Sequence, residues 1–259
     1  MNNIPISTQW TLNASRNIDH VVINSVFMIY CHKTSSKGTG FLLNNGYIIT
    51  NEHVVRDCNY SEIFAISPCG EQVEFARVVI DRRRDLAILK PRKSIENGLS
   101  LNVTENITIG EQVITWGYPL AYNGPAPLLS VGHLAGFQEY AEGGQVKKHL
   151  IVNGAFNPGN SGGPLLKSNG NEIIGVVVSK WAPFTAFHLS ALSALASNGS
   201  GVNFEATNEK GEKINFSESQ LVADLLTHFR SLTQIMIGEA ISVIELKNFL
   251  REHALSWST

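Results

Sequence analysis

The chemically most informative part of this chain is a serine in a turn of small residues. Ser161 lies within residues 157–165, which read NPGNSGGPL. Glycines on both sides permit positive φ angles, which can direct several backbone amides to one spot beside the hydroxyl. Amides arranged in this way stabilise the negative charge that forms on a carbonyl under nucleophilic attack. The turn therefore indicates nucleophilic catalysis, and its alternative is an ordinary β-turn.

A serine nucleophile needs a general base, and His53 is the candidate. It follows residues 40–50, which predict a strand, an Asn-Gly hairpin turn and a second strand. We therefore expect His53 just past a strand end, where a rigid scaffold can orient its imidazole. The alternative is a histidine in a surface loop.

A carboxylate that orients the histidine would complete the group, and Asp85 is the preferred candidate. It directly precedes the apolar run of residues 86–89, so it can enter the interior with that strand. A buried carboxylate needs a partner such as an imidazole N–H. The alternatives are Asp81 as the catalytic carboxylate, or Asp85 as a strand cap in a charged turn. In the second case Arg82–Arg84 form a solvated cluster around it.

These residues, in the order histidine, aspartate, serine, resemble the trypsin-like serine proteases and their bacterial HtrA/Deg branch in particular. The strongest motifs are GTGF at 38–41, TNEHV at 50–54, DLAILK at 85–90 and GNSGGP at 159–164. Chain order is informative because the same triad occurs in other orders on unrelated folds. Weaker similarities extend the resemblance to roughly residues 22–252, apart from one insertion.

The resemblance implies a serine endopeptidase that works through an acyl-enzyme. Ser161 would attack the peptide carbonyl, His53 would transfer the proton, and Asp85 would fix the tautomer of the histidine. The amides of Gly159 and Ser161 would form the oxyanion hole, with Asn160 contributing to the turn. Substrates would be proteins or peptides.

The resemblance also implies a specificity pocket formed by Ala155, Phe156 and Val178. Ala155 lies where trypsin-like specificity uses an acid, so we expect small or aliphatic side chains before the cleaved bond rather than Lys or Arg. Asn160 replaces the aspartate that pairs with a new N-terminus in classical trypsins, so activation of that kind is not expected. Glu52, next to His53, is expected to face solvent, and perturbation of the base is the alternative.

Short apolar runs separated by Gly, Pro and Asn turns predict an all-β fold. Together with the resemblance they predict two six-stranded antiparallel β-barrels of chymotrypsin type, which form one protease domain. We expect an N-terminal lead-in over residues 1–20, the first barrel over 21–105 and the second over 106–259. The catalytic groups would meet in the cleft between the barrels.

Two segments depart from the β pattern. Residues 217–232 begin with a capping-box sequence and predict an amphipathic helix, and residues 244–253 predict a terminal helix. An insertion at about 182–234 contains further helical sequence at 190–196 and then turns rich in Gly and Asn. We expect a regulatory protein partner to bind this insertion. No PDZ-like domain is recognised after the protease.

Composition excludes several classes of function. The formal net charge is −2, which supplies no basic field for nucleic acid or anionic membranes. Hydrophobic residues make up 43% and charged residues 16%, as in a well-filled core. No run of about 18 apolar residues predicts a membrane span. No motif predicts a metal site or a cofactor.

The three cysteines, Cys31, Cys58 and Cys69, are too few and too irregular for the disulfide framework of secreted trypsins. We therefore expect no disulfide and, since no signal sequence is recognised at the N-terminus, a cytoplasmic location. A protease-fold binding or scaffold module with an unproductive triad is the alternative function. A weaker one makes Cys58 the nucleophile, but no glycine-rich turn surrounds it.

Overall fold

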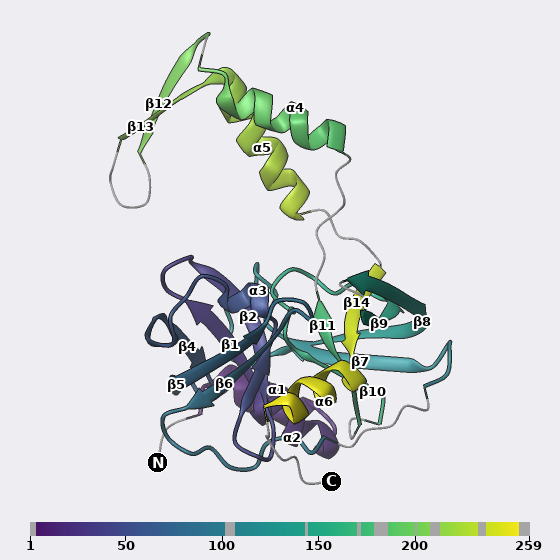
Figure 1. Ribbon diagram of the computed structural model, residues 1–259. Helices are drawn as coiled ribbons and strands as arrows, with labels where there is room; N and C mark the ends of the chain where they lie inside the picture. The colour runs from purple at the N-terminus through teal and green to yellow at the C-terminus, as the bar shows by residue number, and fades with distance from the viewer. Residues whose placement is uncertain are drawn as a thin grey trace. The chain divides into compact units, whose positions relative to one another are not determined.

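The computed structural model describes residues 4–101, 107–142, 145–169, 172–178, 186–199, 201–207, 213–232 and 237–253 (Figure 1). The chain divides into two compact units. One comprises Met1–Lys180 with Met236–Thr259, and the other comprises Trp181–Ile235.

Six antiparallel strands close the first barrel in the order β1-β2-β3-β6-β5-β4. Its interior is filled by aromatic and branched side chains, among them Phe27, Leu42 and Phe75. The strands are β1 (Val26–Cys31), β2 (Ser36–Leu42), β3 (Ile48–Thr50), β4 (Ile63–Ile66), β5 (Gln72–Asp81) and β6 (Leu86–Pro91). A short 3-10 helix, η1 (Tyr60–Glu62), leads into β4.

The second barrel closes in the order β10-β11-β14-β9-β8-β7, again antiparallel throughout. Its strands are β7 (Gln112–Gly117), β8 (Leu128–Glu142), β9 (Gln145–Asn153), β10 (Pro164–Lys167), β11 (Ile173–Val178) and β14 (Ile237–Ser242). The predicted fold of two six-stranded antiparallel barrels is confirmed.

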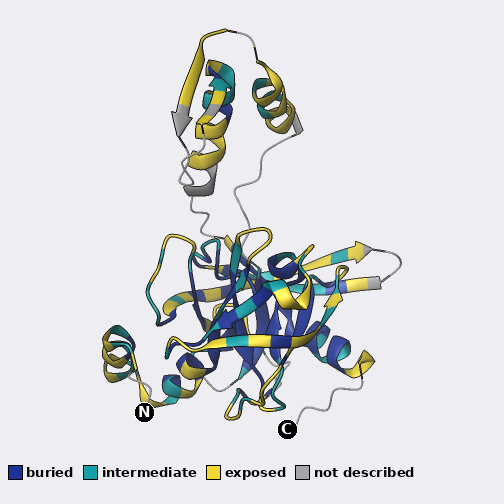
Figure 2. Ribbon diagram, turned by 90° about the vertical axis from the view of Figure 1, so that its left-hand side faces the viewer, coloured by how far each residue is buried: buried dark blue, intermediate teal, exposed yellow. Residues whose placement is uncertain are grey.

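A single apolar cluster joins the two barrels and the terminal helix α6 (Val243–Glu252). Residues of this helix, including Phe249 and Leu250, are buried against strands of the second barrel, and the buried core appears dark blue in Figure 2. Ser242 caps the helix by accepting a hydrogen bond from the Ile244 amide at 3.3 Å. Each such buried side chain contributes about 1.5–3 kcal/mol. The two barrels and the helix therefore share one core.

Residues near the N-terminus form two helices, α1 (Ile6–Ala14) and α2 (Asn17–Ser25), where the sequence predicted only a polar lead-in. The second helix carries Val22 and Ile23 into the cluster that joins the barrels. Because these residues lie in a helix, the first strand begins at Val26, later than the apolar run that starts at Val21. The predicted start of the first barrel at residue 21 is therefore too early, because helix and strand residues are equally apolar there.

The unit Trp181–Ile235 contains α4 (Ala186–Ser197), α5 (Glu218–Leu232) and a hairpin of β12 (Asn203–Thr207) and β13 (Lys213–Ser217). The capping box predicted at the start of α5 is present. The Gln220 amide donates to Ser217 Oγ at 3.3 Å, and the Ser217 amide donates to Gln220 Oε1 at 2.9 Å. The hairpin was not predicted. Among the described residues, no helix has the length and apolar character needed to cross a membrane.

The expectation of no disulfide is wrong, because Cys31 and Cys58 are bonded, with Cα atoms 6.4 Å apart. Cys31 ends β1, and Cys58 follows the short helix that carries His53. Cys69 is the remaining free thiol. Counting cysteines could not reveal this bond because pairing depends on where the fold places two distant segments.

Replacing Cys58 should destabilise the fold measurably. The bond joins two residues 27 positions apart, and constraint of the unfolded chain by a loop of that length is worth about 3.5 kcal/mol. Cys58→Ser should lower the free energy of unfolding by about that amount in urea titrations under non-reducing conditions. The control is Cys69→Ser, which removes the free thiol. An equal effect of the two substitutions would show that the bond does not stabilise the protein.

Candidate active site

His53 lies in a single helical turn, α3 (Glu52–Val55), directly after strand β3. Asp85 lies in the turn between β5 and β6 and has a φ of 55°. Both belong to the first barrel, and the pairing of β3 with β6 brings them together. The rigid strand ends therefore fix the position of each side chain.

Asp85 holds His53 through two hydrogen bonds. Asp85 Oδ2 lies 2.7 Å from His53 Nδ1, and Asp85 Oδ1 accepts the His53 backbone amide at 2.9 Å. The Asn51 side-chain amide also donates to the Asp85 carbonyl at 2.9 Å. An ionised carboxylate requires the proton to be on Nδ1, which leaves Nε2 of the neutral ring as an acceptor. This is the protonation state that a general base needs.

Asp81, the alternative carboxylate, is committed elsewhere. Asp81 Oδ2 accepts from Arg84 Nη1 at 2.6 Å, and Oδ1 accepts the backbone amides of Arg83 and Arg84. Burial opposes ionisation of Asp81, but the hydrogen bonds from Arg84 and Arg83 and the charge of Arg84 outweigh it and lower its pKa. The geometry therefore favours Asp85 over Asp81 as the partner of His53.

Ser161 is buried in a turn that only glycine permits at two positions. Gly159 has a φ of 98° and Gly162 a φ of 87°. A Cβ on Gly159 would lie 2.4 Å from the Tyr118 carbonyl oxygen. The Asn160 amide is used within the turn, where it donates to Asn157 at 3.0 Å. Among the described residues the Gly159 amide donates to no protein acceptor, so it is available to a ligand.

The serine turn of the second barrel docks directly on the first barrel. The Thr39 amide of β2 donates to the Ser161 carbonyl at 2.8 Å. A Cβ on Gly162 would lie 2.1 Å from the Thr39 carbonyl oxygen and 2.3 Å from Thr50 Oγ1. Thr50 is three residues before His53. The structure thus places the three predicted catalytic residues around one seam between the barrels.

A family model described as the trypsin-like peptidase domain matches residues 38–176. The chain belongs to the trypsin-like peptidase family. The matched residues include His53, Asp85 and Ser161, and the predicted resemblance is confirmed.

Similar curated proteins are longer than this chain. The uncharacterized protein y4bJ of Sinorhizobium fredii is 36% identical over 178 residues, which are 66% of this chain and 25% of that protein. A probable periplasmic serine endoprotease DegP-like of Chlamydia pneumoniae is 30% identical over 152 residues, 56% of this chain and 29% of that protein. The chain therefore spans less than a third of the length of these relatives.

Solved structures share the fold. The HtrA-type protease AlgW with tripeptide aligns with a TM-score of 0.59 at 19% identity and covers 92% of this chain and 64% of that chain. The Rv3671c protease from M. tuberculosis, in its active form, aligns with a TM-score of 0.54 at 19% identity and covers 83% of this chain and 85% of that chain.

Within this trypsin-like framework, Glu52 departs from expectation. It was predicted to face solvent, but its side chain is fully buried. Glu52 Oε2 accepts from Arg56 Nη2 at 2.6 Å, and Arg82 Nε lies 3.3 Å from Oε1. The hydrogen bond to Glu52 is the main cause that raises the pKa of Arg56. The prediction failed because a buried carboxylate can be paired, here by Arg56 four residues along the chain and by Arg82 from a turn that is distant in sequence.

The three residues predicted for the specificity pocket lie in different surroundings. Phe156 is buried in the core of the second barrel, where its ring packs against Gly238. Val178 is half-buried and packs on the cluster between the barrels, and Ala155 is also half-buried. Their role in specificity stays a prediction.

Thr39 is a structural residue of the site that the sequence did not single out. Its Oγ1 donates to the Gly159 carbonyl at 2.7 Å and accepts the Tyr118 amide at 2.9 Å. One hydroxyl thus ties together two loops of the second barrel. The GTGF motif at 38–41 was recognised, but its contacts are with residues about 80 to 120 positions away. In the described part, no group of three or more His, Cys, Asp or Glu side chains is arranged to hold a metal ion.

Gly162→Ala should disrupt this trypsin-like site far more than a matched glycine substitution. Gly110 has a similar φ of 90°, but nothing lies within 4 Å of the position of a Cβ. Gly110→Ala should cost about 1–2 kcal/mol from backbone strain alone. Gly162→Ala should cost about 1–3 kcal/mol more because the methyl group overlaps the Thr39 carbonyl. Urea unfolding of both variants measures the difference, and equal losses would contradict the docking of the serine turn.

Proposed function

We propose that this chain is a serine endopeptidase in which Ser161, His53 and Asp85 form the catalytic triad. The observation that carries the proposal is that the Asp85 carboxylate accepts the His53 backbone amide at one oxygen and hydrogen-bonds to the His53 ring at the other. A carboxylate held in this way fixes the tautomer and stabilises the imidazolium that forms during catalysis. The serine turn, docked beside the strand that leads to His53, supplies the nucleophile.

Each group has one role in the proposed reaction. Ser161 Oγ attacks the peptide carbonyl while His53 Nε2 accepts its proton. The tetrahedral intermediate collapses to an acyl-enzyme, and the same proton passes to the leaving amine. Water then attacks the acyl group by the reverse sequence and frees the serine. The amides of Gly159 and Ser161 hold the oxyanion, and Asn160 shapes the turn between them.

The proposed substrates are proteins or peptides with a small or aliphatic residue before the cleaved bond. Ala155 supports this proposal because it places no charge where trypsin-like specificity uses an acid. Burying an unpaired Lys or Arg head group there would cost several kcal/mol. Phe156 and Val178 complete the proposed pocket.

The cytoplasmic location stays a prediction, and two observations speak against it. The small number of cysteines was one of its grounds, but Cys31 and Cys58 are bonded. Disulfides persist mainly in oxidising compartments. The DegP-like relative of Chlamydia pneumoniae is named periplasmic. Fractionation of cells after thiol trapping will decide the compartment and the state of the bond together.

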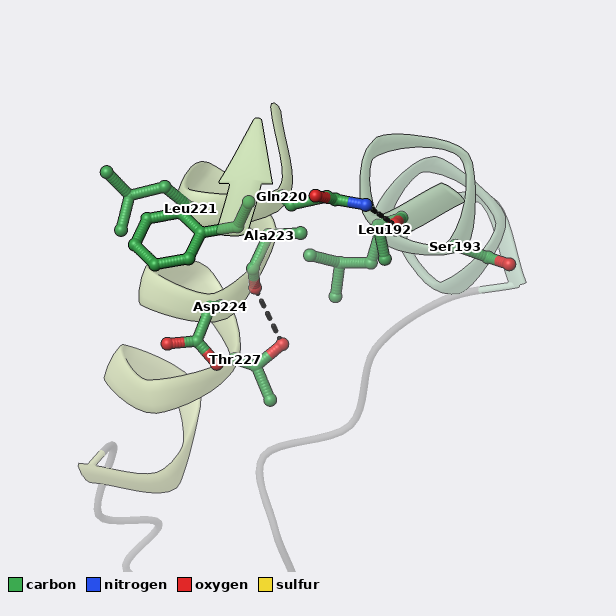
Figure 3. Close-up of a pocket in the computed structure, with 9 residues that line it drawn as sticks. Leu192, Ser193, Gln220, Leu221, Ala223, Asp224 and Thr227 are labelled. Atoms are coloured by element: carbon green, nitrogen blue, oxygen red, sulfur yellow. Dashed lines mark hydrogen bonds between the residues drawn. The ribbon is translucent and has the colours of Figure 1, made fainter. Parts of the chain in front are cut away.

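We propose that a regulatory partner binds the insertion in a groove between α4 and α5. The groove has a volume of about 660 Å³ and is also lined by Phe216 of the hairpin. Figure 3 shows Leu192 of α4 facing the side chains of α5, with Asp224 at the same groove. Several large apolar side chains of this unit are exposed, among them Phe187 at 76% and Phe229 at 63%. Surfaces of this kind commonly bind other proteins.

The charges of the groove indicate the chemistry of the partner. In the described part of the insertion, the Asp224 carboxylate has no hydrogen-bond or ion-pair partner, whereas Gln220 and Thr227 bond to helix carbonyls. Helix α4 carries no Asp, Glu, Lys or Arg. An apolar segment with one Lys or Arg would therefore complement the groove.

The triad prediction is that Ser161→Ala, His53→Ala and Asp85→Asn abolish cleavage of casein and reaction with a fluorophosphonate probe. Losses on the order of 10⁴- to 10⁶-fold are expected because the three groups act as a unit. Asp81→Asn should cost much less. If Asp81→Asn abolished cleavage while Asp85→Asn remained active, the assignment of Asp85 as the catalytic carboxylate would be overturned. A folded wild-type chain that ignores the probe would instead favour the binding module. Sequencing the casein fragments that the wild-type chain produces also identifies the residue before each cleaved bond, which tests the proposed specificity.

The partner prediction uses the full chain with Ser161→Ala, so that bound peptides are not cleaved. An apolar peptide with one Lys should bind about two- to fivefold more tightly than the same peptide with Glu. Asp224→Asn should remove this preference, and Leu221→Ser should weaken both peptides. Glu218→Gln, at the start of the same helix, is the matched control. Equal binding of both peptides to the parent chain would contradict the proposed chemistry, as would no binding.

A further inference from the structure

An arginine next to the catalytic aspartate is buried among acidic side chains. Arg84 precedes Asp85 in the turn between β5 and β6, and its side chain is 8% exposed. The alternative in which Arg82–Arg84 form a solvated cluster is wrong for Arg84. The side chain instead points away from solvent, toward the terminal helix of the chain.

Arg84 binds carboxylates from two parts of the protein that are far apart in sequence. Nη1 and Nη2 donate to the two oxygens of Glu252 at 2.9 and 2.6 Å, which is a bidentate pair. Nε donates to Glu245 at 3.2 Å, and Nη1 also donates to Asp81 at 2.6 Å. Glu245 and Glu252 belong to α6. We call Asp81, Arg84, Glu245 and Glu252 the Arg84 cluster.

The second barrel contacts the same turn independently. Lys147 Nζ of β9 donates to the Arg83 carbonyl, and the Lys148 amide donates to Glu245 Oε1 at 3.3 Å. A cavity of about 470 Å³ lies beside these contacts, lined by Arg84, Lys147 and residues of α6. The turn that carries Asp85 is thus held from outside its own barrel at both Arg83 and Arg84.

The backbone of the turn gives this arrangement a consequence for catalysis. Asp85 has a φ of 55°, a conformation that a residue with a side chain adopts at a cost of about 1–2 kcal/mol. Such a conformation persists only when surrounding contacts fix it. The contact adjacent to Asp85 on its N-terminal side is the Arg84 cluster.

We propose that Arg84 is a positioning residue, which couples the terminal helix α6 to the catalytic histidine by fixing the turn that presents Asp85. This inference rests on the proposed triad. The Arg84 guanidinium bonds to Asp81, Glu245 and Glu252, and we infer that it acts on His53 only through Asp85. The geometry of a rigid fork matters here, because a guanidinium can bind one carboxylate bidentately and two others at once.

Stability alone is a weaker explanation of the cluster. Burying charges costs desolvation free energy, and apolar side chains of similar volume often stabilise a protein as well or better. A cluster that only stabilised the seam between the barrels would have no reason to lie directly beside Asp85. Hydrogen bonds between the charged side chains fix the direction of the turn's backbone, which apolar packing does not do.

The test compares Arg84→Met and Glu252→Gln with Arg83→Met as matched control. The Arg83 side chain is 55% exposed, in the same turn, and its carbonyl contact survives the substitution. Glu252→Gln keeps the shape of a half-exposed side chain, so we expect this variant to fold. It can therefore test the proposal even if Arg84→Met does not fold. Steady-state kinetics with a peptide substrate give kcat and KM separately. Melting curves establish that each variant is folded.

A second measurement does not depend on turnover. In the Ser161→Ala background, NMR follows the Nδ1 proton of His53, whose exchange with water is slowed by its hydrogen bond to Asp85. This readout distinguishes failure of the positioning proposal from failure of the proposed function. A wild-type chain that ignores the fluorophosphonate probe would refute the function, while the proton signal would still report on the turn.

We expect Arg84→Met to lower kcat on the order of 100-fold, because small displacements of catalytic groups have effects of that size. KM should change little, since no residue of the proposed pocket is altered. Glu252→Gln should show a smaller loss of the same kind, Arg83→Met should match the wild type, and the Nδ1 proton should exchange faster in both cluster variants. The proposal would be overturned if either cluster variant folded and its kcat and Nδ1 proton exchange rate both equalled those of the wild type.

Discussion

The close approach of the glycine turn at 159–163 to strand β2 is the constraint on which the rest of the site depends. The proposed nucleophile, Ser161, comes from the second barrel, and the proposed base and carboxylate, His53 and Asp85, come from the first. A single hydroxyl, Thr39 Oγ1, bonds the turn to the Tyr118 loop, and the Thr39 amide bonds Ser161 itself. Gly162 is required because any Cβ there would overlap the Thr39 carbonyl. The site therefore exists only when both barrels are folded and joined.

Two further layers of contacts fix the histidine and the aspartate. The inner layer is local: strand β3 pairs with β6, which sets His53 beside Asp85. The outer layer is made of charges, with Glu52 buried under Arg56 and Arg82 on one side and the Arg84 cluster on the other. The Cys31–Cys58 bond holds the segment after α3 to β1. Burying these charges costs desolvation free energy, and we infer that their role is to fix the direction of the turns that carry them.

The insertion differs from the barrels in how far its apolar side chains are buried. Its described helices leave large apolar side chains exposed, among them Phe187 at 76% and Phe229 at 63%. The barrels also expose some apolar side chains, such as Val146 and Ile237, but they enclose large clusters of fully buried ones. The partner proposed above would cover part of this exposed apolar surface. The alternation of strands could not predict such a surface, because periodicity identifies helices and strands and says nothing about whether a face is covered.

The sequence by itself determined the family, the two-barrel fold and the α5 capping box, and it preferred Asp85 to Asp81 as the partner of His53. These follow from short motifs, since residues a few positions apart have a geometry that the backbone fixes. Only the tertiary structure decided the Cys31–Cys58 bond, the burial of Glu52 and the Arg84 cluster. Arg84 and Glu252 are separated by 168 residues, and Cys31 and Cys58 by 27. Such pairings depend on how distant segments pack, which local sequence does not encode in any readable pattern.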